Sequence, residues 1–346
     1  MPDLPQSIDA PAANQLQSPA PVEPRNNVPD WAIPIFFLIL AAIAFVPILR
    51  IYNSPSRKLT PKPTAVTPAQ TRAQARRQVI AQKPAPLTEN DVERIFSLPL
   101  QARAEELLER SIQHDQRALD LFEEHMPDWK GLVRETPRMK QLMNRAQYSR
   151  DLRVRYAYCD MMLAMDGWSH DSDAVQILIQ RAQKDPDSRA YDVWFLGMLG
   201  GRDVQPEQVH KVLLDYARND PDASVRQWAT EGMRFLGTEE ALDDLFAIFV
   251  SDPSFSVRDR AGCNVSDCGN FKRKQRMRMF PKFLELAENP TTNAQMRSWS
   301  FLAMQEITDV SLPPDTNAWR QWYAQHGAEK MAEFQSMPEW QVRGDE

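Results

Sequence analysis

A short motif that recurs at the spacing of a helix pair constrains this chain more than any other feature. It is clearest as DPDASVRQWA at 220–229 and DPSFSVRDRA at 252–261, which start 32 residues apart. A unit of two short helices cannot bury its apolar face alone, so such units are stable only when neighbours stack into a continuous core. The recurrence predicts an all-α fold, an α-solenoid of stacked helix pairs, over residues 149–326. The less regular copies begin at Ser149, Asp185 and Asn289.

The residues of the 220–229 copy predict its local structure. Asp220 can cap the start of a helix, and Pro221 suits the first turn. From Val225 to Leu236, apolar and small residues follow the spacing of one buried helical face. Gly237 fits a helix end that needs a positive φ. A partner helix is expected from Thr238, with a buried face made of Leu242, Leu245, Phe246 and Phe249.

The Asp-Pro and Val-Arg pattern resembles HEAT repeats, and the resemblance covers about residues 149–310. The copies at 185 and 289 depart from the pattern because they lack the Val. The ending LPPDTNAWRQWYAQHG is similar to the terminal segment of some bacterial HEAT-like proteins. In that family, an Asp and an Arg at these positions commonly form a ladder between neighbouring units. The resemblance implies this ladder role for Asp220, Arg226, Asp252 and Arg258.

Helical spacing also precedes the repeats. Thr88 and Asp91 have the spacing of a capping box, and apolar residues continue at helical intervals through residues 88–148, a helical N-terminal cap region. No stretch shows a sustained period of two, so we expect essentially no sheet. Residues 327–346 are interpreted as a C-terminal tail.

An uncharged run from Trp31 to Leu49 predicts a single transmembrane helix over residues 31–52. Its 19 residues span roughly 28 Å as a helix, close to the thickness of a bilayer core. Trp31 and Tyr52 stand at its two ends, where aromatic side chains favour the membrane interface. A cleaved signal peptide would need a basic start, whereas residues 1–30 hold four acidic residues and one Arg. Those residues are expected to be a disordered tail.

The flank after this span predicts its orientation. Lys and Arg recur from Arg50 to Lys83, with no acidic residue before Glu89. The positive-inside rule places such a flank in the cytoplasm. We therefore expect an inner (plasma) membrane protein with its N-terminus outside and its C-terminal domain in the cytoplasm. Residues 53–87 are interpreted as a Pro-rich basic linker, which is either a topology signal only or also a contact for anionic lipid.

The charge of the folded part argues against nucleic-acid binding. Residues 91–346 carry 32 Lys and Arg against 42 Asp and Glu, whereas binding to a phosphate backbone depends on excess basic residues. One basic run lies inside this acidic part. It is interpreted either as a solvated helix face or as a patch for an acidic partner or anionic lipid. Its members are Lys272, Arg273, Lys274, Arg276, Arg278 and Lys282.

The cysteines and histidines do not form a recognisable reactive site. Cys263 and Cys268 make a C-x4-C pair without a second pair or a nearby His, which is a poor zinc signal. On a helix, their thiols would lie about one and a half turns apart, so we interpret both as core or loop cysteines. The odd total, completed by Cys159, fits a reducing compartment. The stretch SHDSD at 169–173 is interpreted as a polar turn before a helix rather than a set of oxygen ligands.

The sequence also lacks the common catalytic motifs. It has no P-loop, no G-x-G-x-x-G, no G-x-S-x-G and no pair of carboxylates isolated in an apolar setting. We therefore assign no catalytic residue, metal or cofactor. Tryptophan recurs in the repeats, mostly at core positions, although one or two rings on the concave face could anchor a peptide. These are Trp168, Trp194, Trp228, Trp299, Trp319 and Trp322.

Together these features predict a binding protein rather than an enzyme. The expected role is a membrane-tethered scaffold or assembly factor that binds unidentified protein partners through a helical-repeat surface. The resemblance leaves one alternative open, because some HEAT-like proteins are lyases that attach tetrapyrroles such as bilins. The lack of a convergent acid–base or Cys–His site argues mildly against that alternative.

Overall fold

The computed structural model describes residues 85–342, all within one unit, 72–346. Every helix in residues 85–342 is too short or too polar to span a lipid bilayer. The predicted span at 31–52, with Trp31 and Tyr52 at its ends, lies outside the described residues, as do the tail at 1–30 and nearly all of the linker.

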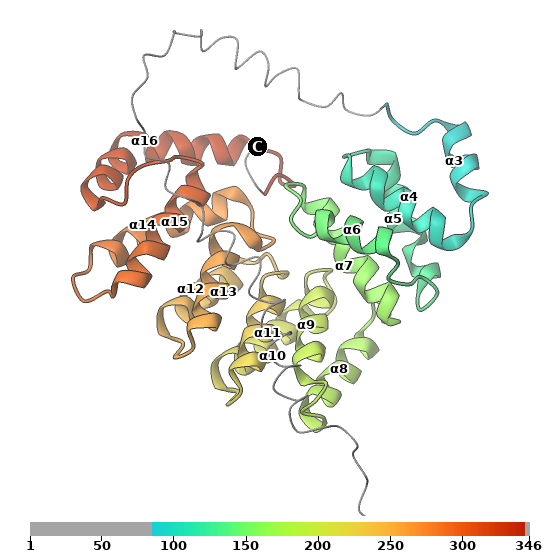
Figure 1. Cartoon of the computed structure of the whole chain (residues 1–346), viewed down its shortest axis with the longest axis horizontal. Helices are drawn as coiled ribbons and strands as arrows, with labels where there is room; N and C mark the ends of the chain where they lie inside the picture. Colours follow the sequence, from blue (N-terminus) through green and yellow to red (C-terminus); the bar gives the residue numbers. More distant parts are fainter. Residues whose placement is uncertain (1–84, 343–346) are drawn as a thin grey trace, which may run out of the picture. The chain divides into compact units, whose positions relative to one another are not determined.

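The all-α prediction is confirmed for the described residues, which form helices and no strand (Figure 1). Two short segments wind differently, a 3-10 helix at Met126–Trp129 and a π-helix at Asn264–Cys268. The α-helices are α3 (Glu89–Phe96), α4 (Leu100–Ile112), α5 (Gln116–His125), α6 (Pro137–Ala146), α7 (Leu152–Asp166), α8 (Ser172–Lys184), α9 (Arg189–Gly200), α10 (Pro206–Asn219), α11 (Ala223–Met233), α12 (Glu239–Ser251), α13 (Phe255–Cys263), α14 (Arg273–Glu288), α15 (Ala294–Thr308) and α16 (Thr316–Ser336).

Side-chain caps fix where several of these helices begin. Thr88 and Asp91 form the expected capping box at the start of α3. Asp171 accepts from the amide of Ala174 and caps α8, so SHDSD is a polar turn with a cap. The cap of α11 is Asp222, two residues later than predicted. Asp220 instead accepts from the Asp222 amide at 2.9 Å and shapes the preceding turn, because Pro221 follows it outside the helix.

The helices from α8 to α15 follow one another in chain order (Figure 1). Helices that share an Asp-Pro or equivalent turn pack on each other, as α10 does on α11 and α12 on α13. The second helix of each pair belongs to one continuous layer. In this layer α9 contacts α11, α11 contacts α13 and α13 contacts α15. We call α9, α11, α13 and α15 the ladder layer. Its fully buried large apolar side chains, such as Met233, Val257 and Met304, each contribute about 1.5–3 kcal/mol.

The C-terminal residues return to the start of the repeats. Helix α16 continues ten residues beyond 326, and Val342 is fully buried within the segment interpreted from sequence as a tail. The Leu152 amide donates to the Trp340 carbonyl at 2.7 Å, and the Val342 amide donates to the Arg150 carbonyl at 2.9 Å. Residues 340–342 are therefore fixed to the chain just before α7.

Candidate functional site

The predicted ladder residues form ion pairs between neighbouring units: Arg226 pairs with Asp252, and Asp220 pairs with Arg189 of the preceding unit. The Arg226 guanidinium donates to both Asp252 carboxylate oxygens, at 2.8 and 3.1 Å, and both side chains are buried. This hydrogen bonding raises the pKa of Arg226 above its usual value. Asp220 pairs with Arg189, 3.3 Å away, rather than with Arg226. Arg258 donates to the backbone carbonyl of Asp252 at 2.6 Å, within its own unit.

Four arginines make similar backbone contacts in successive units, and three of them share one helical register. Three of them donate to the carbonyl of the residue that ends the preceding helix, whereas Arg189 donates to a carbonyl inside α8. The pairs are Arg189 with Ala182 at 2.8 Å, Arg226 with Asp220 at 3.0 Å, Arg258 with Asp252 at 2.6 Å, and Arg297 with Asn289 at 3.2 Å. Arg226, Arg258 and Arg297 are each the fourth residue of their helix, so residues at equal offsets from these three occupy equivalent places in the ladder layer. Arg189 is instead the first residue of α9.

The position two residues after each ladder arginine always carries a flat side chain. We call these four residues the stripe: Tyr191, Trp228, Arg260 and Trp299. Trp228 and Trp299 were noted from the sequence, but not that they occupy the same position in their helices. The arginine contacts reveal this common position. The repeated triplets RAY, RQW, RDR and RSW were the available signal.

The stripe carries exposed aromatic surface. Tyr191 is 58% exposed and stacks on Trp228, with ring centroids 5.9 Å apart. Further along, Trp299 contacts Phe255, which is 56% exposed, at 4.7 Å. Leu302, one turn after Trp299, is 50% exposed. A cluster of exposed large apolar side chains marks an interaction surface more often than a single exposed side chain does.

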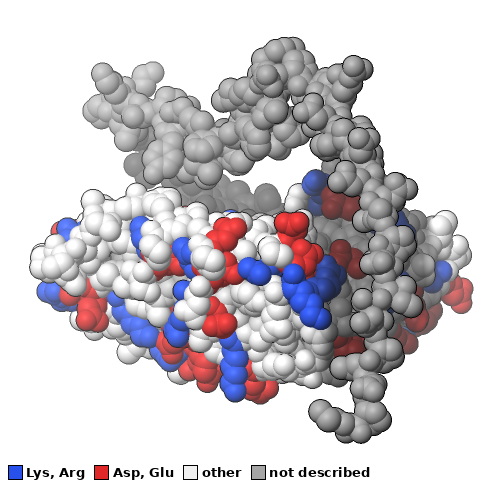
Figure 2. Space-filling model, turned by 90° about the horizontal axis from the view of Figure 1, so that it is seen from below, with Lys and Arg blue, Asp and Glu red and all other residues white. Residues whose placement is uncertain are grey.

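Acidic side chains accompany the stripe. Glu231 lies one turn after Trp228 and pairs with Arg260 at 3.0 Å. Asp187, four residues before Tyr191, and Glu306, two turns after Trp299, are exposed. The stripe therefore combines aromatic rings with carboxylates. On the face of the molecule shown in Figure 2, basic and acidic residues are intermixed.

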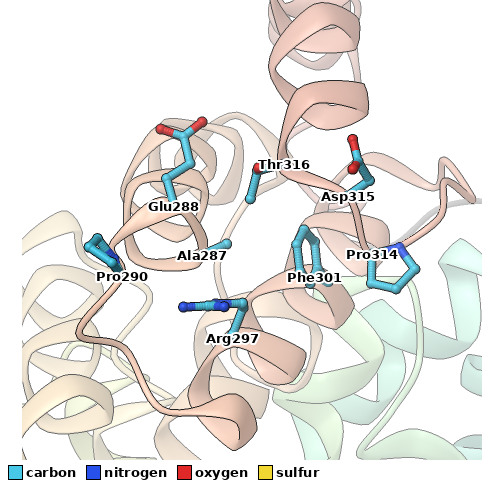
Figure 3. A pocket seen from close by; sticks show the side chains of 8 residues that line it. All are labelled: Ala287, Glu288, Pro290, Arg297, Phe301, Pro314, Asp315 and Thr316. Atoms are coloured by element: carbon cyan, nitrogen blue, oxygen red, sulfur yellow. The ribbon is translucent and has the colours of Figure 1, made fainter.

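A depression lies between the end of α14, α15 and the start of α16, with a volume of about 420 Å³. Figure 3 shows Glu288 and Asp315 on opposite sides, with Arg297 and Phe301 between them. Its polar groups already serve the fold. Glu288 pairs with Arg320 at 2.8 Å, Asp315 accepts from the Ala318 amide at 2.7 Å, and Arg297 is the ladder arginine of its unit. The stripe is therefore the better candidate.

One buried ionic cluster was not found from the sequence. Asp160 accepts from Arg202 at 2.9 Å, and Arg202 also contacts Glu123 at 2.8 Å. Burial raises the pKa of Asp160 to about 6 and lowers the pKa of nearby His170 to about 4. The adjoining cavity measures about 70 Å³, which holds a few water molecules rather than a substrate. The cluster fits a structural role better than a catalytic one.

The two shifted pKa values predict opposite pH effects on stability. Folded His170 binds fewer protons than unfolded His between pH 4 and 6.5, so it makes stability rise with pH there. Folded Asp160 binds more protons than unfolded Asp between pH 3.8 and 6, so it makes stability fall with rising pH. In urea denaturation at pH 4.5 and 7, H170Q should reduce the gain in stability toward pH 7 by about 1–2 kcal/mol, and D160N should increase it. Equal pH profiles for both variants would contradict this assignment.

The basic run at 272–282 is mostly engaged within the chain. Arg273 and Arg276 are buried, which removes them from any surface patch. Arg273 pairs with Asp309, and Lys272 and Lys274 both pair with Glu339. Arg278 and Lys282 pair with Asp243, at 3.2 and 2.6 Å. The run thus anchors α14 to α12 and to the residues after α16.

The two cysteines of the C-x4-C pair converge, contrary to the expectation from helical geometry. Cys263 and Cys268 form a disulfide, with Cα atoms 5.5 Å apart. The expectation assumed α-helical winding, whereas residues 264–268 are π-helical. Cys159 is a buried free thiol whose pKa burial raises to about 12. Among the described residues, no group of three or more His, Cys, Asp or Glu is placed to hold a metal ion.

Comparison of the chain with protein-family models, with curated proteins and with solved structures found no match.

Proposed function

We propose that the chain is a membrane-tethered scaffold or assembly factor whose HEAT-like α-solenoid binds a protein partner along the stripe. The single observation that carries the proposal is the stripe itself, a flat side chain two residues after an arginine in four successive ladder helices, with Tyr191 stacked on Trp228. The inter-unit pairs of Arg189 with Asp220 and Arg226 with Asp252 support the solenoid part. The tether is the segment 31–52, with the domain on the cytoplasmic side.

The chemistry of the stripe favours an extended partner segment rich in Pro, Lys or Arg. Aromatic faces stack well on proline rings and on cationic groups. The exposed carboxylates at Asp187 and Glu306 favour a positive partner and disfavour a nucleic acid, whereas Glu231 already pairs with Arg260. Regular spacing across successive helices suits a ligand that runs across them rather than a compact small molecule.

Site-specific photo-crosslinking in native membranes tests this proposal. A photoreactive amino acid at Tyr191 is expected to give a discrete adduct with one partner protein. The matched control is Ile177 on α8, which is 49% exposed but outside the ladder layer. Adding W228A should reduce the Tyr191 adduct about tenfold or more, because stacked aromatic anchors commonly contribute 2 kcal/mol or more to binding. Equal adducts at both positions would contradict the stripe as the binding surface.

A further inference from the structure

The disulfide and the π-helix depend on each other. In an α-helix, residues five apart are rotated by about 500°, so their side chains point about 140° away from each other. The π-helical hydrogen bond from the Gly269 amide to the Asn264 carbonyl, 3.1 Å long, winds the segment more loosely. This winding places Cys263 and Cys268 on the same side. Both are only partly buried, so small thiols can reach them.

Arginines from α7, α14 and the end of α11 donate hydrogen bonds to the residues at the end of the π-helix. The carbonyls of residues 267–269, which we call the carbonyl hub, accept from buried arginines. Arg155 of α7 donates to the Gly269 carbonyl at 2.6 Å, and Arg234 at the end of α11 donates to the Cys268 carbonyl at 2.9 Å. Arg276 of α14 donates to the Asp267 carbonyl at 2.8 Å and also to that of Gly269. A guanidinium buried this deeply is costly to leave without acceptors.

The carbonyl hub is connected to the C-terminal residues. Arg276 donates through its other terminal nitrogen to the Val342 carbonyl at 2.6 Å. Val342 in turn is fixed to Arg150, and Trp340 to Leu152. The same short segment therefore joins the first repeat, the middle repeats and the end of the chain.

We propose that Cys263 and Cys268 form a thiol–disulfide switch that controls attachment of residues 340–342 through the carbonyl hub. Two molecules of a thiol such as glutathione reduce the bond. The products are two cysteine thiols and one glutathione disulfide, and an excess of that disulfide drives the reverse reaction. Reduction removes the covalent cross-link between the side chains of residues 263 and 268. The segment can then rewind toward an α-helix, turning the hub carbonyls away from their arginines.

The proposal is independent of the stripe and its partner. It also accounts for a disulfide in a domain that we place in the cytoplasm, where disulfides that form are usually transient or redox-sensing. Cys159 takes no part in the exchange because it is fully buried.

Hydrogen exchange of the full chain in glutathione buffers tests the switch. Reduction should speed amide exchange about tenfold or more both at 264–270 and at 340–342, with little change in α4. C159S should respond as the wild type does. A Cys263→Ser, Cys268→Ser double variant should exchange like the reduced protein in every buffer.

Two results would overturn the proposal. One is exchange at 340–342 that does not depend on the redox state of the pair. The other is alkylation of the unfolded wild type that counts three thiols even in excess glutathione disulfide, since the oxidised chain should show only Cys159. The alkylation measurement does not require the double variant to fold.

Discussion

R226A should lower the free energy of unfolding by about 3–5 kcal/mol, the largest loss expected from any single ion pair of the described residues. The substitution leaves the Asp252 carboxylate, whose side chain is 5% exposed, without its bidentate partner. It also removes a donor from the Asp220 carbonyl. Removing one partner of a buried pair costs far more than the pair contributes net, because the remaining charge stays desolvated. Urea denaturation measures the loss.

A surface pair provides the matched control for this prediction. Lys330 and Glu333 are 2.9 Å apart on α16, and K330A should change stability by less than about 1 kcal/mol. A double-mutant cycle with R226M and D252N should give a coupling of about 2 kcal/mol or more, because D252N keeps the acceptor for the Ser254 amide. Two results would show that the ladder does not hold neighbouring units together. One is a loss of unfolding free energy with R226A no larger than that with K330A, and the other is a coupling energy near zero.

Local features of the fold were predictable because they depend on nearby residues. The capping box at Thr88 and the buried face of α11, including Val225, Ala229 and Met233, follow from short-range spacing and were both found. Helix periodicity and the scarcity of alternating patterns were likewise enough to predict an all-α chain.

Features that depend on contacts between distant residues were not predictable in the same way. The pairing of Arg226 with Asp252 rather than with Asp220 depends on how adjacent units stack, which no single unit encodes. The Asp160 cluster draws Glu123 and Arg202 from segments separated by 79 residues. The disulfide was missed for a local reason, since five residues of π-helix have no distinctive composition.

The stripe lies between these two cases. The triplets RAY, RQW, RDR and RSW are visible in the sequence, but each one resembles an ordinary start of a helix. Only the shared contact from three of the arginines to the end of the preceding helix shows that Trp228, Arg260 and Trp299 are equivalent. Tyr191 joins them through its stacking on Trp228. Repeat proteins give this advantage generally, because one structural contact repeated along the chain aligns copies that have lost their sequence similarity.

G197A should lower the free energy of unfolding by about 3 kcal/mol, although Ala favours a helix over Gly by up to about 1 kcal/mol. Gly197 of α9 lies directly against Gly232 of α11, and a Cβ atom there would be 2.2 Å from the Gly232 carbonyl oxygen. The obstacle is backbone, so the two helices must move apart. G327A in α16 provides the comparison, because the atoms nearest to its added Cβ belong to the ring of Tyr323, a side chain that is partly exposed. A smaller loss is expected there.

The same substitution should separate the rings of the stripe. Tyr191 belongs to α9 and Trp228 to α11, so their 5.9 Å stacking depends on the close approach at Gly197. G197A should therefore weaken the near-ultraviolet circular dichroism from packed aromatic rings while the far-ultraviolet helix signal is kept. The crosslink from position 191 should fall with it. Unchanged stability and an unchanged near-ultraviolet spectrum in G197A would show that the glycine contact sets neither the packing of α9 on α11 nor the geometry of the stripe.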